Sequence, residues 1–215
     1  MIFDRLFYYR DDTPRDGALN MAIDEALARS ASAPLLRVYR WARPSISFGY
    51  FGRAREVASR WPGRELVRRW TGGGEVPHGD DFTYTLAVPG SHPFSRTSAR
   101  ESYRALHEVL AALLPGAALA DADGDDAPAC FERPVAADVV IANRKVAGAA
   151  QRRGAFGLLH QGSVQGVPWP ADLPSRLTAA LAREVTPAEF SPALLAESAR
   201  LASEKYRTNA WNERR

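Results

Sequence analysis

Residues 68–84 have the sequence RRWTGGGEVPHGDDFTY, in which the consecutive glycines Gly72, Gly73 and Gly74 stand between two expected strands. Glycine takes positive φ without strain and lets a ligand or another backbone approach closely. Arginine side chains and backbone N–H groups beside such a loop suit the oxygens of an anionic head group. The alternative is a flexible turn, which is the commoner structure for a bare run of glycines. The expected flanking strands are residues 65–69 and 81–88.

Length and composition are those of an ordinary globular protein. The chain has 215 residues, of which 46% are hydrophobic and 25% charged, and we expect one domain, residues 1–215, with a substantial core. Apolar runs stay well below the ~20 residues that span a bilayer. The first ten residues, MIFDRLFYYR, are typical of a strand rather than a signal peptide, because an acid stands at Asp4. We therefore expect a cytoplasmic protein without a membrane partner, and a monomer by default.

The basic residues argue against a nucleic-acid partner. The net charge is +3, and the arginines are spread along the chain without an aromatic-basic stripe or a recognition helix. Of 28 basic residues only Lys145 and Lys205 are lysines. A lysine retained among arginines suggests a need for an ammonium group that can lose its proton, although chance retention is the alternative.

Cys130 is the only cysteine in the chain. A single cysteine excludes an internal disulfide framework and a cysteine-rich metal site, and we expect no bound metal. The residue is either a buried filler or a reactive thiol. It lies near the end of the acidic stretch 115–134, which we expect to be a loop because its spacing does not fit a calcium site.

The hydrophobic patterns predict an α+β fold. Alternating and helical periodicities follow one another along the chain, and their order predicts a mixed, mainly antiparallel sheet covered by helices. Asn20, Asp24 and Glu25 lie off the apolar face of the first helix and are expected in solvent, whereas His107 is expected to be structural. The expected strands are residues 2–9, 35–41, 45–51, 65–69, 82–88, 138–142, 145–152 and 156–167. The expected helices are residues 17–29, 53–61, 97–114, 170–183 and 192–203.

The glycine stretch contains neither GxGxxG nor GxxxxGK followed by Ser or Thr, but it closely resembles the RRxTGGGxVxH signature of the lipoate and biotin protein ligase superfamily, in its lipoate ligase and octanoyltransferase branches. The similarity extends over nearly the full length. It includes GALNMAIDEALAR (17–29), LLRVYRWARPSISFGYFGR (35–53), ADVVIANRKVAGAAQRR (137–153), LLHQGSV (158–164) and KYRTNAWN (205–212). The resemblance implies the α+β catalytic domain of these enzymes, related to class II aminoacyl-tRNA synthetases, without a C-terminal accessory domain.

Two reactions occur among such proteins, and each needs different groups. A lipoate ligase uses ATP and Mg²⁺ to activate lipoate as an acyl adenylate. An octanoyltransferase needs no cofactor and passes the acyl group from acyl carrier protein through an enzyme cysteine to a lysine of a lipoyl domain. Because the chain stops soon after the catalytic region, we favour the transferase, with the ligase and a non-catalytic lipoate-binding or lipoyl-domain-binding module as alternatives.

The resemblance also assigns site residues. Cys130 matches the position of the family nucleophile and Lys145 that of its lysine, so these two are the predicted catalytic pair. Arg69 is expected to hold substrate, whereas Arg68 is expected to face solvent, and His78 either contacts substrate or hydrogen-bonds its own loop. The family's HGS or HGT is HQGS here, and CFERPVAADV only partly matches CFxxPSxxE. The predicted substrate-binding residues are Arg69, Gly72, Gly73, Gly74, His78, Gly148, Ala149, His160 and Gly162.

Overall fold

The computed structural model describes residues 1–121 and 134–214, so Cys130 lies outside the described residues. A large mixed sheet has the strand order β11-β1-β2-β6-β10-β9-β8-β7, and a small sheet has the order β4-β3-β5. The strands of the large sheet are β1 (Phe3–Arg15), β2 (Leu35–Trp41), β6 (Phe82–Pro89), β7 (Ala117–Leu119), β8 (Val139–Ile141), β9 (Arg144–Gly154), β10 (Gly157–Val164) and β11 (Ala182–Pro187). Those of the small sheet are β3 (Ser45–Phe48), β4 (Glu65–Arg68) and β5 (Glu75–His78).

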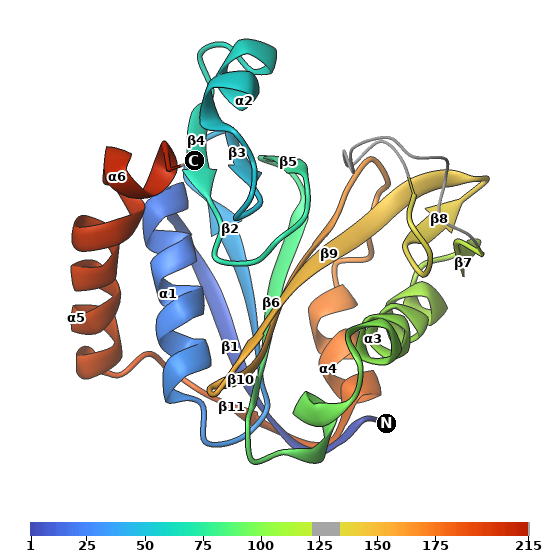
Figure 1. Ribbon diagram of the computed structural model, residues 1–215. Coiled ribbons are helices and arrows are strands. Elements are labelled where there is room, and N and C mark those ends of the chain that lie inside the picture. The colour runs from blue at the N-terminus through green and yellow to red at the C-terminus, as the bar shows by residue number, and fades with distance from the viewer. Residues whose placement is uncertain (122–133, 215) are drawn as a thin grey trace.

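Helices cover both faces of the large sheet, with α1 and α5 on one side and α3 and α4 on the other (Figure 1). The small sheet and α2 stand at one end, next to α6 and the C-terminus (Figure 1). The helical segments are α1 (Gly17–Ser30), α2 (Ala54–Arg60), η1 (Pro93–Arg96), α3 (Ala99–Leu113), α4 (Leu173–Leu181), α5 (Pro192–Leu201), η2 (Ala202–Tyr206) and α6 (Asn209–Asn212). No helix in residues 1–121 or 134–214 combines the length and apolarity needed to cross a bilayer.

The strand pairing confirms a mixed, mainly antiparallel sheet. β1 runs parallel to both β2 and β11, while β2, β6, β10, β9, β8 and β7 pair antiparallel in turn. Three strands, β5, β7 and β11, are absent from the sequence prediction. β5 and β11 each contain a proline, and both lie at a sheet edge, where the missing N–H is tolerated.

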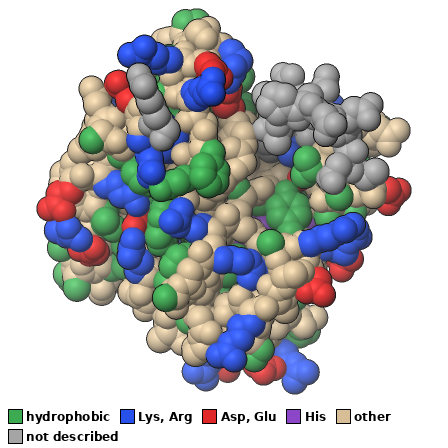
Figure 2. Space-filling model, in the orientation of Figure 1, with side chains coloured by type: hydrophobic (Ala, Val, Ile, Leu, Met, Phe, Trp, Pro, Cys, Tyr) green, Lys and Arg blue, Asp and Glu red, His purple; other side chains and the backbone are tan. Residues whose placement is uncertain are grey.

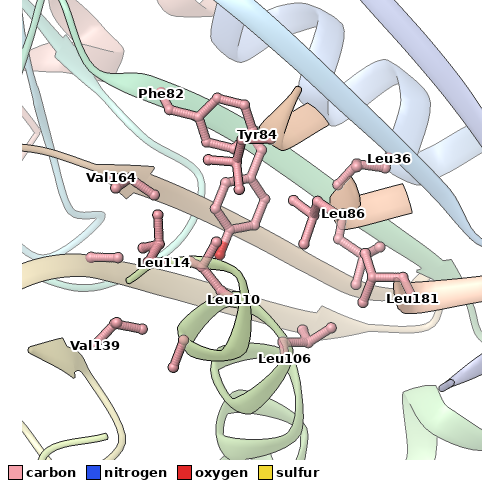
Figure 3. Packing of buried hydrophobic residues seen from close by; sticks show 14 of the residues in the cluster. Leu36, Phe82, Tyr84, Leu86, Leu106, Leu110, Leu114, Val139, Val164 and Leu181 are labelled. Atoms are coloured by element: carbon pink, nitrogen blue, oxygen red, sulfur yellow. The ribbon is translucent and has the colours of Figure 1, made fainter. Parts of the chain in front are cut away.

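The main core lies between the large sheet and the helices α3 and α4. Leu106 and Leu110 of α3 meet Tyr84 and Leu86 of β6 there (Figure 3). A capping box formed by Ser98 and Glu101 fixes the start of α3, which sets the rotation of its apolar face. Each fully buried leucine contributes about 1.5–3 kcal/mol through lost contact with water. His107 of α3 is fully buried, in agreement with its expected structural role.

The polar face of α1 is buried, so the prediction that Asn20, Asp24 and Glu25 face solvent is wrong. Asp24 Oδ1 accepts a 2.7 Å hydrogen bond from Arg37 Nη1. Glu25 Oε2 accepts from Lys205 Nζ at 2.5 Å and from the Tyr206 hydroxyl at 2.6 Å. The periodicity identified one apolar face, but α1 is covered on one side by the sheet and on another by α5 and η2. Charges enclosed in this way are tolerated because each has a partner.

Candidate active site

A pocket of about 720 Å³, including the space at its open mouth, lies between the glycine loop and the strands β9 and β10. Residues from both sheets and from α1 and α3 line it. They are Met21, Tyr39, Trp41, Ser47, Arg69, Gly73, Gly74, Glu75, Val76, His78, Thr83, Tyr103, Val135, Lys145, Gly148, Ala149, Ala150, Gln161, Gly162 and Ser163. The structure thus brings together most of the predicted substrate-binding residues and Lys145 around one concave space, a common property of small-molecule sites.

The glycine loop is held in place by hydrogen bonds. Arg69 Nη2 donates to the carbonyl oxygens of Gly72 and Gly74, both at 2.9 Å. Gly73 has φ +83°, and a Cβ added to Gly49 would lie 1.9 Å from Gly73 O, so glycine is required at both positions. A free flexible turn is therefore not the structure of this segment. Gly73 and Gly74 line the pocket, and Gly72 lies on an adjoining groove that also reaches Tyr103.

Arg69 supports the loop from within. Its side chain is buried, and Nη1 donates to Ser47 Oγ at 2.8 Å. Burial lowers its pKa to about 10, because desolvation disfavours the charged form. The guanidinium lines the pocket, but three of its hydrogen bonds already go to the protein. Direct contact between Arg69 and substrate stays a prediction.

Arg68 does not face solvent, contrary to the prediction, since only 1% of its surface is exposed. Its guanidinium donates to five backbone carbonyl oxygens, which belong to Tyr50, Gly52, Trp211, Asn212 and Arg214. The C-terminal segment folds over the end of β4 and encloses it. The side chain that precedes the glycine loop therefore binds the chain end, an arrangement with no signal in local sequence.

His78 is fixed by two hydrogen bonds and a stacked ring. Its Nδ1 lies 2.8 Å from Asp81 Oδ2 and its Nε2 lies 2.7 Å from Ser47 Oγ. The imidazole stacks on Trp41 with 3.9 Å between ring centroids. Burial raises the pKa of Asp81, but His78 and the hydroxyls of Thr83 and Ser163 outweigh it and lower that pKa to about 2. His78 thus hydrogen-bonds both its own segment, through Asp81, and the neighbouring strand β3, through Ser47, and it also lines the pocket.

Lys145 extends into the pocket from the start of β9. Its Nζ lies 2.7 Å from Asp138 Oδ2, and 10% of its side chain is exposed. A Cβ on Gly148 would lie 2.5 Å from Lys145 Cε and 2.8 Å from Nζ. The glycine in β9 therefore leaves room for the lysine of the same strand. The pairing of β8 with β9 shifts register close to Lys145, between Val139 and Val140.

Two residues of β10 have different environments. Gly162 lines the pocket, and a Cβ there would lie 2.5 Å from the Tyr84 hydroxyl oxygen. His160 lies behind the pocket wall, fully buried, with its ring nitrogens 3.3 Å from Tyr84 Oη and 3.2 Å from Gln151 Nε2. Burial, and then the neighbouring His107, place the pKa of His160 well below its ordinary value. A substrate-binding role for His160 stays a prediction.

Gln161 is the residue at which the chain departs from the family's HGS pattern, and its side chain is buried in a hydrogen-bond network. Its Nε2 donates to Asp24 Oδ2 at 2.7 Å, and its Oε1 accepts from Thr71 Oγ1 at 2.8 Å. The side chain therefore joins the buried network of α1 to the segment that enters the glycine loop. Gln161 also lines the pocket, so this network forms part of the pocket wall.

The sequence prediction missed three polar residues at the site, namely Asp138, Tyr103 and Gln161. Asp138 opens the segment that leads to Lys145, which is a faint signal, and Tyr103 has only the periodicity of an apolar helix position. The relation of Cys130 to the pocket lies outside the described residues. Within residues 1–121 and 134–214, no three acidic or histidine side chains gather as metal ligands.

The surface beside the glycine loop is cationic and aromatic. Figure 2 shows Lys and Arg side chains around a group of hydrophobic ones on this face. The guanidinium carbons of Arg152 and Arg214 lie 5.0 and 4.1 Å from the centroid of the Tyr50 ring, within the range of cation–π attraction. Arg152 also donates to Trp70 O at 3.0 Å, which connects this surface to the start of the loop.

Comparisons with known proteins identify the family of the chain. The family model of the lipoyl protein ligase A/B catalytic domain matches residues 16–166. Octanoyltransferase LipM of Oceanobacillus iheyensis is 35% identical over 170 residues, which are 73% of this chain and 62% of that protein. The enzyme of the same name from Carboxydothermus hydrogenoformans is 39% identical over 159 residues, 67% of this chain and 59% of that protein. The chain thus spans less than two thirds of the length of these relatives.

Solved structures share the fold. Protein Ta0514 of T. acidophilum, a proposed lipoate protein ligase, superposes with a TM-score of 0.78 at 21% identity, and 99% of each chain is covered. A lipoate-protein ligase A bound with ATP gives a TM-score of 0.73 at 20% identity, again with 99% of each chain covered. The mixed sheet flanked by helices is therefore the architecture of lipoate ligase catalytic domains.

Proposed function

Because the chain belongs to the lipoyl protein ligase A/B catalytic domain family, we propose that it transfers octanoyl groups onto lysines of lipoyl domains. The observation that carries the proposal is Lys145, which lines one pocket together with Gly73, Gly74 and Gly148. The similarity to proteins named octanoyltransferase LipM supports the same reaction. The proposed donor is acyl carrier protein, and no cofactor is required.

The proposed reaction has two steps with Cys130 as nucleophile. Its thiolate attacks the carbonyl carbon of the octanoyl thioester, a new C–S bond forms, the bond to the carrier sulfur breaks, and that sulfur leaves as a thiol with the proton of the Lys145 ammonium. The acceptor lysine amine then attacks the acyl-cysteine and gives a proton to Lys145, so that an amide forms, the bond to the Cys130 sulfur breaks, and the Cys130 thiolate is released. An ammonium at Lys145 favours the thiolate in the first step, and the same group without its proton accepts one from the acceptor amine in the second.

The pocket walls match the needs of a medium-length acyl chain. Met21, Trp41 and Val76 give the interior an apolar surface, which favours burial of methylene groups by about 0.8 kcal/mol each. Backbone amides of Gly73 and Gly74 are the proposed donors to the oxyanion. Ala149 is excluded from this role, because its N–H donates to the Tyr103 hydroxyl at 3.0 Å, and its proposed contribution is to the pocket surface.

The alternative is ATP-dependent lipoate ligation through an acyl adenylate, with Mg²⁺. It is supported by the shared fold with an ATP-bound lipoate-protein ligase A. In that reaction Lys145 and Arg69 would neutralise phosphate, and Cys130 would have no covalent role. A binding module that carries lipoate or docks on lipoyl domains is a further alternative. The monomeric state and the cytoplasmic location stay predictions for each of these functions.

The decisive experiment is the intact mass of the protein after incubation with octanoyl acyl carrier protein in the absence of ATP. We expect a hydroxylamine-labile octanoyl adduct on the parent protein and none on Cys130→Ser. Lys145→Arg should form the adduct slowly and pass it on poorly. A Cys130→Ala protein with full transfer activity would refute the cysteine-linked mechanism. Lipoylation that appears only with lipoate and ATP would refute the transferase and favour the ligase. Binding without transfer from any donor would favour the binding module.

A further inference from the structure

We propose that Asp138 and Tyr103 are positioning residues that hold the amine of Lys145 at its place in the pocket. Neither residue is needed as a nucleophile, acid or base in the proposed transfer, and neither was singled out as a site residue from sequence. The inference depends on the proposed function only for its kinetic consequence. Its structural consequence, the fixed environment of the lysine amine, is measurable without any acyl donor.

Asp138 is fully buried, and three groups of the described residues contact its carboxylate. Its Oδ1 accepts from the Tyr103 hydroxyl at 2.6 Å. Its Oδ2 accepts from the backbone N–H of Val135 at 2.7 Å and lies 2.7 Å from Lys145 Nζ. A carboxylate removed from water in this way is stable only with such partners. The position of its Oδ2, and with it the Lys145 amine, is therefore fixed from two further directions.

Tyr103 fixes the other oxygen of the carboxylate. Its hydroxyl accepts from Ala149 N at 3.0 Å, so the hydroxyl proton is left for Asp138. Burial, and then the charge of Asp138, raise the pKa of Tyr103 far above its ordinary value, so the hydroxyl stays a donor. Tyr103 comes from α3 and Ala149 from β9. One hydroxyl thus joins the helix, the lysine-bearing strand and the carboxylate.

Gly148 completes the arrangement. A Cβ at this position would collide with Lys145 Cε and Nζ and would lie 3.2 Å from Asp138 Oδ1. The lysine side chain therefore runs along its own strand and past residue 148 to reach the carboxylate. Glycine is needed at position 148 because a side chain there would block the Lys145–Asp138 contact. In the glycine loop, by contrast, glycine is needed for the backbone conformation and for close backbone contacts.

A fixed, charge-paired amine has a definite use in the proposed reaction. The 2.7 Å contact with Asp138 Oδ2 holds the Lys145 amine at one place in the pocket. Fixed geometry matters as well, because a displacement of about 1 Å at a catalytic group can reduce the rate by about 100-fold.

The chain offers an internal standard for the test, since Lys145 and Lys205 are its only lysines. Lys205 Nζ is paired with Glu25 Oε2 at 2.5 Å, away from Asp138. Trace acetylation at neutral pH followed by peptide mass spectrometry gives the ratio of modification at Lys145 to that at Lys205. The test variants are Asp138→Asn and Tyr103→Phe, and the matched controls are Asp12→Asn, at an exposed ion pair with Arg10, and Tyr8→Phe.

We expect the ratio to rise at least threefold in Asp138→Asn, because the amine loses the carboxylate that holds it at 2.7 Å, and to rise less in Tyr103→Phe. The control variants should keep the parent ratio. In the transfer assay, kcat of Asp138→Asn should fall about 100-fold, while KM for the octanoyl donor changes less than about threefold. Tyr103→Phe removes one hydroxyl and keeps the aromatic ring, so it remains informative if Asp138→Asn does not fold.

A parent-like acetylation ratio in both test variants would overturn the inference. If the melting temperature of these variants also falls, Asp138 only holds the 134–138 segment. If the ratio rises as expected but the parent protein transfers no acyl group from any thioester, the positioning role stands and the proposed transferase fails.

Discussion

Gly148→Ala should displace Lys145 while leaving the fold in place. The added Cβ would lie 2.5 Å from Lys145 Cε, whereas ordinary contacts begin near 3.4 Å. The end of the lysine side chain must therefore withdraw by about 0.9 Å, and a misplacement of this size reduces catalysis by about 100-fold. Asp138 would keep its hydrogen bonds from Tyr103 and Val135.

The expected loss of stability is small, because the collision involves the flexible end of a side chain. The weakened ion pair costs stability, and the reduced backbone freedom of alanine in the unfolded chain offsets about 0.4–1 kcal/mol of that loss. We expect the free energy of unfolding to fall by at most about 2 kcal/mol. For a chain of this length, this corresponds to a decrease in Tm of less than about 8 °C.

The assay compares the rate of transfer from octanoyl carrier protein with the Tm measured by circular dichroism. Gly79→Ala is the matched control, since a Cβ there meets no atom of the described residues within 4 Å. It should keep both the parent rate and the parent Tm. A Gly148→Ala protein that melts normally and transfers at the parent rate would refute the dependence of catalysis on this lysine position.

Three other perturbations have defined outcomes. Burial lowers the pKa of His107 to about 4 from its ordinary 6.5. As the pH falls, the unfolded chain therefore binds the proton before the folded chain does. The free energy of unfolding keeps its full value above pH 6.5 and falls by about 3 kcal/mol as the pH drops to 4. Urea denaturation at pH 7 and 4.5 should show this loss, and His107→Gln should reduce it. Arg68→Ala leaves five carbonyl oxygens without their donor, so we expect a loss of about 3 kcal/mol or more in unfolding free energy, measured against an Arg53→Ala surface control. Gly49→Ala places a Cβ 1.9 Å from Gly73 O, and the displaced loop should raise KM for the octanoyl donor by about tenfold.

For each of these three predictions, one result would contradict the reasoning. A stability that is equally sensitive to pH in the parent and in His107→Gln would contradict the neutral buried imidazole. An Arg68→Ala protein as stable as Arg53→Ala would mean that the C-terminal carbonyl groups find other donors. An unchanged KM in Gly49→Ala would show that the loop yields without effect on the pocket.

Local sequence predicted the features that depend on neighbours in the chain. The glycine loop and the β8–β9 hairpin that carries Lys145 each lie within a short segment. The family resemblance includes both segments. Asp24 and Arg68 were misassigned because their partners lie far along the chain. Arg37, at the centre of the α1 network, is 13 residues from Asp24, and the carbonyl groups bound by Arg68 include some that lie more than 140 residues away.

The Asp138–Tyr103 pair shows the same limit at the site itself. The two residues are 35 positions apart, and Tyr103 has the spacing of a core residue of α3. Periodicity assigns a side chain to a face, but it does not distinguish a tyrosine that packs from one whose hydroxyl binds a carboxylate. The strand β11 was missed for a related reason, since six residues that end in proline carry little alternation.

The pairing of β1 with β11 has a consequence for biosynthesis. Arg5 and Glu184 on these neighbouring strands are 179 positions apart. One edge of β1 therefore stays unpaired during synthesis until β11 has been made. At about 5–20 residues per second, synthesis leaves that edge open for roughly 10–35 s. Unpaired strand edges promote association between chains. Nascent chains that stall before β11 should therefore depend on chaperones more than the finished protein does, which pulse-chase labelling of truncated chains would measure.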